Sequence, residues 1–368
     1  MREVREGSLR IFHMGGRRVR YDRMSRGITR PPIPETISLP STSLPMALTL
    51  QSTRKLNDGN EILILGFGAF CEDRNIRAGW QGSIRCRYLG SRGEPALPSP
   101  GACFLPRQVL ISQAGYRHID SATWYENERE VGQAIRDFCE STGTPRSAIF
   151  YTTKLKLNDG YEPTLKAIQF SLDECGLEYI DLYLIHGPLG GPAARKECWR
   201  AICDAQKEGR VKSIGISTFG VRHIKEILEM GLAVPAVNQV RPVGRFFQAS
   251  TDQSYEIDLH PFMIRTEIVN LCHEHGISLE AWAPLVRGLR FKHPSIVSLA
   301  KKHHKEPAQI LLRYCLQKGY VAIPKSSSRA RIASNTNIFD FALDEKEVAD
   351  LDALDEGLVT DWDPTECP

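Results

Sequence analysis

The sequence of 368 residues lacks the features that mark several broad classes of protein. Its ten cysteines form no Cys-x-x-Cys pair and it has no Asn-x-Ser/Thr sequon, so a disulfide scaffold, a zinc ribbon and a glycosylated ectodomain are unsupported. No run approaches the roughly 18 apolar residues of a membrane-spanning helix. Residues 1–30 are rich in Arg but lack the apolar segment of a secretory signal. We expect a cytoplasmic protein without a membrane partner.

The chain also lacks a strong excess of charge. Its 47 Lys and Arg residues against 44 Asp and Glu residues give a formal net charge of +3. Residues 1–45 contain 9 Arg and 4 acidic residues, so the positive balance belongs to this segment, and no nucleic-acid-binding face is implied for the rest. Because this segment ends in a stretch rich in Pro, Ser and Thr, we expect a disordered basic tail before a single catalytic domain at 46–368.

A complete Gly-rich phosphate loop is absent as well. Gly66-Phe67-Gly68 is not followed by the third Gly of a dinucleotide-binding fingerprint, and no Gly-Lys-Ser/Thr occurs. Short β-rich runs instead alternate with apolar residues at helical spacing. This alternation predicts the α/β class and a parallel (β/α)8 TIM barrel, with an open doubly wound sheet as the alternative. The eight candidate strands are 62–68, 116–122, 149–155, 181–186, 213–218, 236–240, 279–283 and 320–324.

Local turn signals support this division of the chain. Asp58-Gly59 supplies the positive φ angles of a tight turn, so an N-terminal β-hairpin of 54–56 with 62–65 is predicted. Glycines also follow several helical patterns, where left-handed caps are expected. They are Gly176, Gly209, Gly231, Gly276 and Gly319.

Two aperiodic insertions, at about 71–104 and 240–256, interrupt the alternation. Segments this long without a helical or strand period are unusual in a compact domain. Either they are loops that control access of substrate, or they are translated non-coding sequence from an imperfect gene model, which also accounts for residues 1–45. We favour the second explanation, because removing all three segments leaves 272 residues, a suitable length for one barrel.

Four ionisable side chains stand at or just after the expected ends of consecutive strands. They are Asp120, Tyr125, Lys154 and His186. Each alone has an ordinary interpretation, as a helix cap, a packing residue, a solvated charge or a buried imidazole. Active sites of (β/α)8 barrels lie at the C-terminal ends of the strands, and a neighbouring ammonium lowers the pKa of a phenol from about 10. As a set, the four residues therefore predict a proton-transfer device.

The same residues carry a resemblance to a known family. The sequence GYRHIDSA at 115–122, with YENE at 125–128, resembles the first signature of the aldo-keto reductases, in particular the small reductases of fungi and bacteria. The four ionisable residues match the catalytic tetrad of that family in order, at successive spacings of 5, 29 and 32 residues. The sequence IPKSSSRARIASN at 323–335 resembles the cofactor motif of the family.

The resemblance implies hydride transfer between a nicotinamide and a carbonyl. Ser217 and Gln239 match the residues that hydrogen-bond the carboxamide, and Thr218 replaces the neighbouring Asn of the family. Trp282 matches the aromatic residue that stacks on the nicotinamide, in a motif that ends with Leu285. Core packing is the alternative role for Trp282.

The end of the last strand indicates which nicotinamide cofactor is used. Lys325, Ser326 and Arg331 bring two cations and a hydroxyl to a helix start, which suits the 2′-phosphate of NADPH better than NADH. A solvated basic helix start is the alternative. The other residues of this motif assigned to cofactor binding are Ser327 and Asn335.

The remaining expectations concern metal, substrate and partners. His273 and His275, like the pair His303-His304, lack the spacing of a metal site, so no metal is expected. The substrate is expected to be a small carbonyl compound: an aldehyde, a ketone, a ketose or a secondary-metabolite intermediate. The protein is expected to be a monomer. The alternative function is a catalytically impaired, nucleotide-binding barrel that serves as an interaction protein.

Overall fold

The computed structural model describes residues 48–70, 114–240 and 259–358, together with Thr365 and Cys367. Met46–Pro368 forms one compact unit. The expected basic tail at 1–45 and the aperiodic segment at 71–104 lie outside the described residues. The second aperiodic segment also lies outside them, except for its first residue, Val240, which ends a strand.

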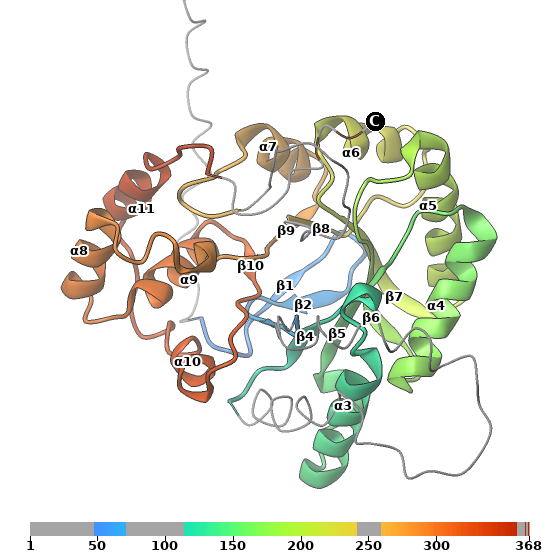
Figure 1. Cartoon of the computed structure of the whole chain (residues 1–368), viewed down its shortest axis with the longest axis horizontal. Coiled ribbons are helices and arrows are strands. Elements are labelled where there is room, and N and C mark those ends of the chain that lie inside the picture. Colours follow the sequence, from blue (N-terminus) through green and yellow to red (C-terminus); the bar gives the residue numbers. More distant parts are fainter. Residues whose placement is uncertain (1–47, 71–113, 241–258, 359–364, 366, 368) are drawn as a thin grey trace, which may run out of the picture. The chain divides into compact units, whose positions relative to one another are not determined.

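Eight parallel strands form one sheet in the order in which they follow one another along the chain (Figure 1). Between the two outer strands, the amide of Gly66 donates to the carbonyl of Ala322 at 2.9 Å, and the amide of Ala322 donates to the carbonyl of Ile64 at 2.9 Å. These bonds close the sheet into the predicted (β/α)8 barrel. The strands are β3 (Phe67–Gly68), β4 (His118–Asp120), β5 (Phe150–Leu155), β6 (Ile180–Ile185), β7 (Val211–Ser217), β8 (Val237–Val240), β9 (Ser278–Ala281) and β10 (Val321–Ala322).

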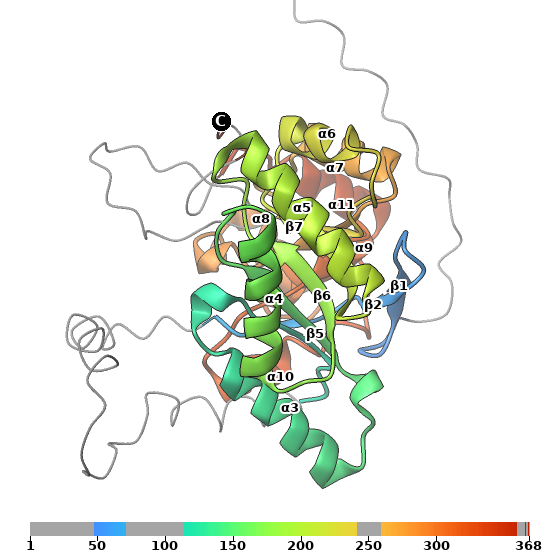
Figure 2. The ribbon, with the colours of Figure 1, turned by 90° about the vertical axis from the view of Figure 1, so that its right-hand side faces the viewer.

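Helices cover the outside of the barrel (Figure 2). Their amphipathic faces pack on the outward side chains of the strands, as in β6, where Tyr183 and Ile185 belong to the larger core between strands and helices. The glycines expected as left-handed caps all have positive φ. The helices are α3 (Glu128–Thr142), α4 (Tyr161–Cys175), α5 (Gly191–Lys207), α6 (Val221–Leu228), α7 (Thr266–Glu274), α8 (Pro294–Lys302), α9 (Pro307–Gln317), α10 (Arg329–Ser334) and α11 (Glu345–Asp352).

The predicted hairpin closes the end of the barrel where the strands begin. Its strands are β1 (Thr53–Lys55) and β2 (Glu61–Leu63), which pair antiparallel. Asn57 donates to the carbonyl of Pro235 at 2.9 Å, just before β8. Inside the barrel, Ile62 packs with inward side chains such as Leu182 and Val237 in a second apolar cluster. This end of the interior is therefore filled with apolar side chains.

The prediction of one strand at 62–68 is wrong in one respect, because the first part of this segment pairs in the hairpin and the last part pairs in the barrel. Residues up to Leu63 form the second hairpin strand, whereas Leu65 bridges to Ala322 and Phe67 begins the barrel strand. A continuous apolar run cannot reveal such a change of partner, since both sheets bury these side chains. The other seven strands lie where they were expected.

Helix α3 approaches the end of α4 so closely that only glycine fits at Gly132. A Cβ atom there would lie 1.9 Å from the carbonyl oxygen of Cys175, a backbone atom that has little room to move. We predict that Gly132→Ala lowers the free energy of unfolding by about 1–3 kcal/mol. Chemical denaturation measures the change. Gln133→Ala, at the exposed neighbouring position, is the control and should stay within about 0.5 kcal/mol. Equal stability of Gly132→Ala and the parent protein would contradict the packing argument.

Candidate active site

The centre of the candidate site is an ion pair inside the barrel. Lys154 on β5 and Asp120 on β4 both have fully buried side chains, and Lys154 Nζ lies 2.6 Å from Asp120 Oδ2. The ammonium also donates to the carbonyl of Ser121 at 2.6 Å. Successive side chains of a strand point to opposite faces, so in β5 Lys154 shares the inner face with Phe150 and Thr152. The alternation along these strands thus turns both charges inward.

Tyr125 and His186 lie beside this pair. Tyr125 ends the short 3-10 helix η2 (Thr123–Tyr125), and the centroid of its ring is 5.3 Å from Lys154 Nζ. The ring centroids of Tyr125 and His186 are 5.9 Å apart, in an edge-to-face arrangement. Phe70, just after β3, also packs against Tyr125, with ring centroids 5.2 Å apart. The structure therefore brings the four sequence-predicted side chains to one end of the barrel.

Gln239 on β8 connects this group to a buried carboxyl that the sequence analysis missed. Its Nε2 donates to Asp120 Oδ2 at 2.7 Å and also to Glu280 Oε1 on β9. Glu280 is fully buried, and desolvation, with the negative charge of Asp120 as a smaller cause, raises its pKa to about 8. One signal was available in the sequence, because Glu280 is the only charged residue of a strand that is otherwise apolar or small.

His118 on β4 is a second missed residue, two positions before Asp120 and therefore on the same inner face. Its Nδ1 lies 3.3 Å from the carbonyl oxygen of Leu63, which only accepts, so Nδ1 carries the hydrogen. Its Nε2 lies 3.2 Å from Thr152 Oγ1 and 3.9 Å from Glu280 Oε2. Complete desolvation lowers the pKa of His118 to about 4, so the imidazole is neutral at pH 7.

The residues predicted to hold a nicotinamide carboxamide lie at the ends of β7 and β8. Ser217 Oγ and Gln239 Oε1 are buried and have no hydrogen-bond partner within the described part of the chain. Buried polar atoms are normally paired, so these two fit the donor and acceptor groups of an amide ligand. Thr218 differs: its hydroxyl donates to the carbonyl of Ser217 at 2.6 Å, and its φ of 60° is in the left-handed region. That backbone conformation is costly for a β-branched residue and is adopted more readily by the Asn of the family.

The loop after β9 holds the other residues of the predicted nicotinamide pocket. Trp282 is 7% exposed, and its backbone amide donates to the carbonyl of Val240 at 3.1 Å. Leu285 is half-buried and packs against the larger core. Burial of Trp282 to this degree is compatible both with packing and with a flat ligand above the ring.

The predicted phosphate-binding residues lie at the same end of the barrel. The amide of Gly68 donates to the carbonyl of Pro324, and the amide of Ala69 donates to the carbonyl of Asp120. The end of β3 therefore connects the segment that precedes Lys325 to the segment that holds Asp120. Lys325 is exposed, Ser326 is buried, and Arg331 Nε donates to Ser326 Oγ at 3.3 Å. The remaining two members are Ser327, which is exposed, and Asn335, which is buried where α10 ends.

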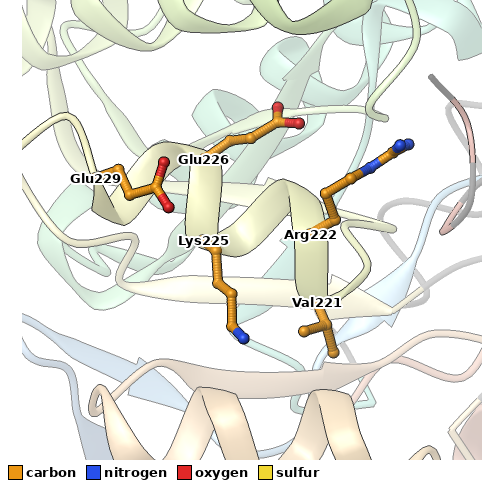
Figure 3. A pocket seen from close by; sticks show the side chains of 5 residues that line it. All are labelled: Val221, Arg222, Lys225, Glu226 and Glu229. Carbon is orange, nitrogen blue, oxygen red and sulfur yellow. The ribbon is translucent and has the colours of Figure 1, made fainter.

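Other features of the described residues do not add to this site. A pocket on the outer surface at α6 is lined by Val221, Arg222, Lys225, Glu226 and Glu229 (Figure 3), none of which comes from a strand end. Within residues 48–70, 114–240 and 259–358, no group of three or more His, Cys, Asp and Glu side chains is arranged to hold a metal. Within the same ranges no helix is long and apolar enough to cross a membrane.

Comparison with known proteins agrees with this geometry. The model of the aldo/keto reductase family matches residues 108–246 and 251–356. An uncharacterized oxidoreductase of Schizosaccharomyces pombe is 42% identical over 257 residues, which are 70% of this chain and 86% of the relative. Glyoxal reductase of Bacillus subtilis is 35% identical over 312 residues, 84% of this chain and 95% of the relative.

Solved structures show the same relation. An aldo-keto reductase of Bombyx mori, crystallised in complex with NADP, superposes with a TM-score of 0.67 at 30% identity. The superposition covers 85% of this chain and 98% of the Bombyx protein. Because the family model covers more than half of the sequence and the solved relative shares the fold, this chain belongs to the aldo/keto reductase family of oxidoreductases.

Proposed function

We propose that the protein is an NADPH-dependent reductase of small carbonyl compounds, with Tyr125 as the general acid. The observation that carries the proposal is the grouping of Tyr125, His186, Lys154 and Asp120 at the C-terminal ends of the barrel strands, with Lys154 Nζ 5.3 Å from the centroid of the Tyr125 ring.

NADPH, when bound, supplies the hydride. The unpartnered Ser217 Oγ and Gln239 Oε1 would hold its carboxamide, and Trp282 would lie against the nicotinamide ring. Lys325 and Arg331 would bind the 2′-phosphate, because a cation and a planar guanidinium fork favour a dianionic group over the hydroxyl of NADH. The complex of NADP with the related Bombyx mori protein supports this choice.

The proton comes from this chain's own residues. Tyr125 donates its phenolic hydrogen to the carbonyl oxygen, while His186, beside it, hydrogen-bonds the same oxygen and orients it. The positive charge of Lys154 favours the negative charge that develops on the phenol oxygen as the proton leaves. Asp120 keeps the ammonium paired and in position, which its burial requires.

A small aldehyde is the substrate class that we favour. Glyoxal reductase, a relative over 84% of this chain, is named for such a compound. A ketone, a ketose or a secondary-metabolite intermediate fits the same chemistry. An interaction protein without turnover is the alternative, and oxidation of NADPH with a panel of simple aldehydes separates the two.

Tyr125→Phe tests the proton donor. Removing the hydroxyl should lower kcat for aldehyde reduction by about 100-fold or more, since general acid catalysis contributes on the order of 10²–10⁴. Binding of NADPH, followed by fluorescence titration, should not change. Tyr161→Phe removes a hydroxyl that bonds Asp204 outside the barrel and serves as the control. Normal turnover by Tyr125→Phe would show that another group donates the proton.

Lys325→Ala tests the choice of cofactor. Loss of a charged hydrogen bond to the 2′-phosphate should raise KM for NADPH by about tenfold or more, because such bonds contribute about 1.5–3 kcal/mol. KM for NADH should change by less than about twofold. Lys301→Ala, at an exposed position on α8, is the control. A similar rise of KM for both cofactors would rule out a phosphate contact.

Thr218→Asn tests whether Thr at position 218, in place of Asn, lowers both the stability of the protein and its affinity for NADPH. Asn tolerates the left-handed backbone at φ 60°, so the free energy of unfolding should rise by about 1 kcal/mol, and its amide should tighten binding of NADPH. Thr218→Gly relieves the same strain without offering an amide, so it should gain stability alone. Denaturation and NADPH titration measure the two effects. If Thr218→Asn is less stable than the parent, the strain argument fails.

A further inference from the structure

Glu280 is a buried carboxyl inside the barrel that the mechanism above does not use. It lies on β9, in register with Gln239 on β8 and Val321 on β10, and its side chain is fully buried. Its Oε1 accepts from Gln239, whereas its Oε2 has no hydrogen-bond partner within the described residues. Buried polar atoms are normally hydrogen-bonded, so a buried carboxyl oxygen without a partner beside Gln239 is unusual.

The charges around Glu280 favour its neutral form. The titratable groups that face it are His118 and Asp120 on β4 and Lys154 on β5, while the residues paired with it on β8 and β10 do not titrate. Lys154 is already neutralised by Asp120 at 2.6 Å, so an ionised Glu280 would leave one uncompensated negative charge in the interior. Desolvation accordingly raises the pKa of Glu280 to about 8.

The imidazole of His118 fits a neutral Glu280. Because Nδ1 carries the hydrogen toward the carbonyl of Leu63, Nε2 of the neutral ring keeps a lone pair, and two oxygens face it: Thr152 Oγ1 at 3.2 Å and Glu280 Oε2 at 3.9 Å. A lone pair facing a carboxylate is repelled by it, whereas a lone pair facing a protonated oxygen is attracted. Because Oε1 already accepts from Gln239, the proton of a neutral Glu280 belongs on Oε2, the oxygen that faces His118.

The same contacts decide which way the amide of Gln239 faces. Asp120 Oδ2 and Glu280 Oε1 are both acceptors, so both hydrogens of Gln239 Nε2 are used, and Gln239 Oε1 has no partner among the residues that the structure describes. We propose that Glu280 is a positioning residue: as a neutral acid it fixes Gln239 with its Oε1 free to accept from the nicotinamide carboxamide, and leaves Asp120 the only negative charge beside Lys154. The role toward the cofactor rests on the proposed function.

Thermal unfolding of the full chain at several pH values tests the neutral state of Glu280. Between its ordinary value of 4.5 and about 8, the folded protein holds a proton that the unfolded chain releases, so this group lowers stability as pH rises through that window. Glu280→Gln cannot titrate, and its NH2 group can face His118 as the acid O–H does. Its Tm should equal that of the parent at pH 5 and exceed it by about 5 °C at pH 8.5.

The opposite charge state gives a different result. If Glu280 were ionised against a protonated His118, Glu280→Gln would lower Tm at neutral pH and the gain at pH 8.5 would not appear. Either observation overturns the proposal. Infrared difference spectra give a second measure, since the carbonyl band of a protonated carboxylic acid should be lost in Glu280→Gln at pH 7.

Titration with NADPH tests the positioning of Gln239. Glu280→Leu removes the acceptor, so Kd for NADPH should rise about tenfold with a smaller change in kcat, whereas Glu280→Gln keeps the acceptor and should stay within about twofold. Glu128→Gln is the matched control. Glu128 is also a buried carboxyl, but it accepts from Thr153 and not from Gln239, so Kd for NADPH should not change. Equal weakening by Glu280→Gln and Glu280→Leu, or no weakening by either, would overturn the positioning role.

The two experiments separate the inference from the proposed function. If the parent protein does not bind NADPH, the proposed function fails, and with it the role of Glu280 toward the cofactor. The pH dependence of Tm tests the neutral state of Glu280 without any cofactor. It also keeps the inference falsifiable if Glu280→Leu fails to fold, because Glu280→Gln preserves the shape of the side chain.

Discussion

The ion pair of Lys154 and Asp120, fully buried and 2.6 Å long, is the constraint on which the site depends. Removing one partner from such a pair leaves an uncompensated charge and costs about 3–5 kcal/mol, so the two residues must occupy facing positions on neighbouring strands. The position of Lys154 in turn determines where a positive charge meets the ring of Tyr125. Gln239 donates to the same carboxylate, so Asp120 connects the group of four ionisable residues to the residue predicted to bind the nicotinamide carboxamide.

The interior of the barrel divides into an apolar end and a polar end. At the beginning of the strands, Leu182 and Val237 pack beneath the hairpin residue Ile62, and water is excluded. Toward the ends of the strands, the same inward alternation presents Asp120 and Lys154 instead. Functional side chains on strands are held by the ladder hydrogen bonds of both neighbours, which keeps their separations fixed. The apolar end supplies stability, and the polar end supplies chemistry.

Desolvation is the main cause of the protonation states of His118 and Glu280 at the polar end of the barrel. The same burial that lowers the pKa of His118 to about 4 raises that of Glu280 to about 8, so both groups are neutral at pH 7. Lys154 and Asp120 form an ion pair beside these two groups. Thr218, next to Ser217, has a backbone conformation with a φ of 60°. That conformation is costly for a β-branched residue and suits Asn better.

The sequence by itself determined the alternation of strands and helices, and it predicted that Asp120, Tyr125, Lys154 and His186 lie near one another, because periodicity and strand-end position are local properties of the chain. It also identified the hairpin turn, although of Asp58 and Gly59 only Gly59 has the expected positive φ. Only the tertiary structure decided that 62–68 changes partner between two sheets, and that His118 and Glu280 meet inside the barrel. These features depend on side chains that come together across the barrel and on the loss of water there, neither of which is encoded in any one segment of sequence.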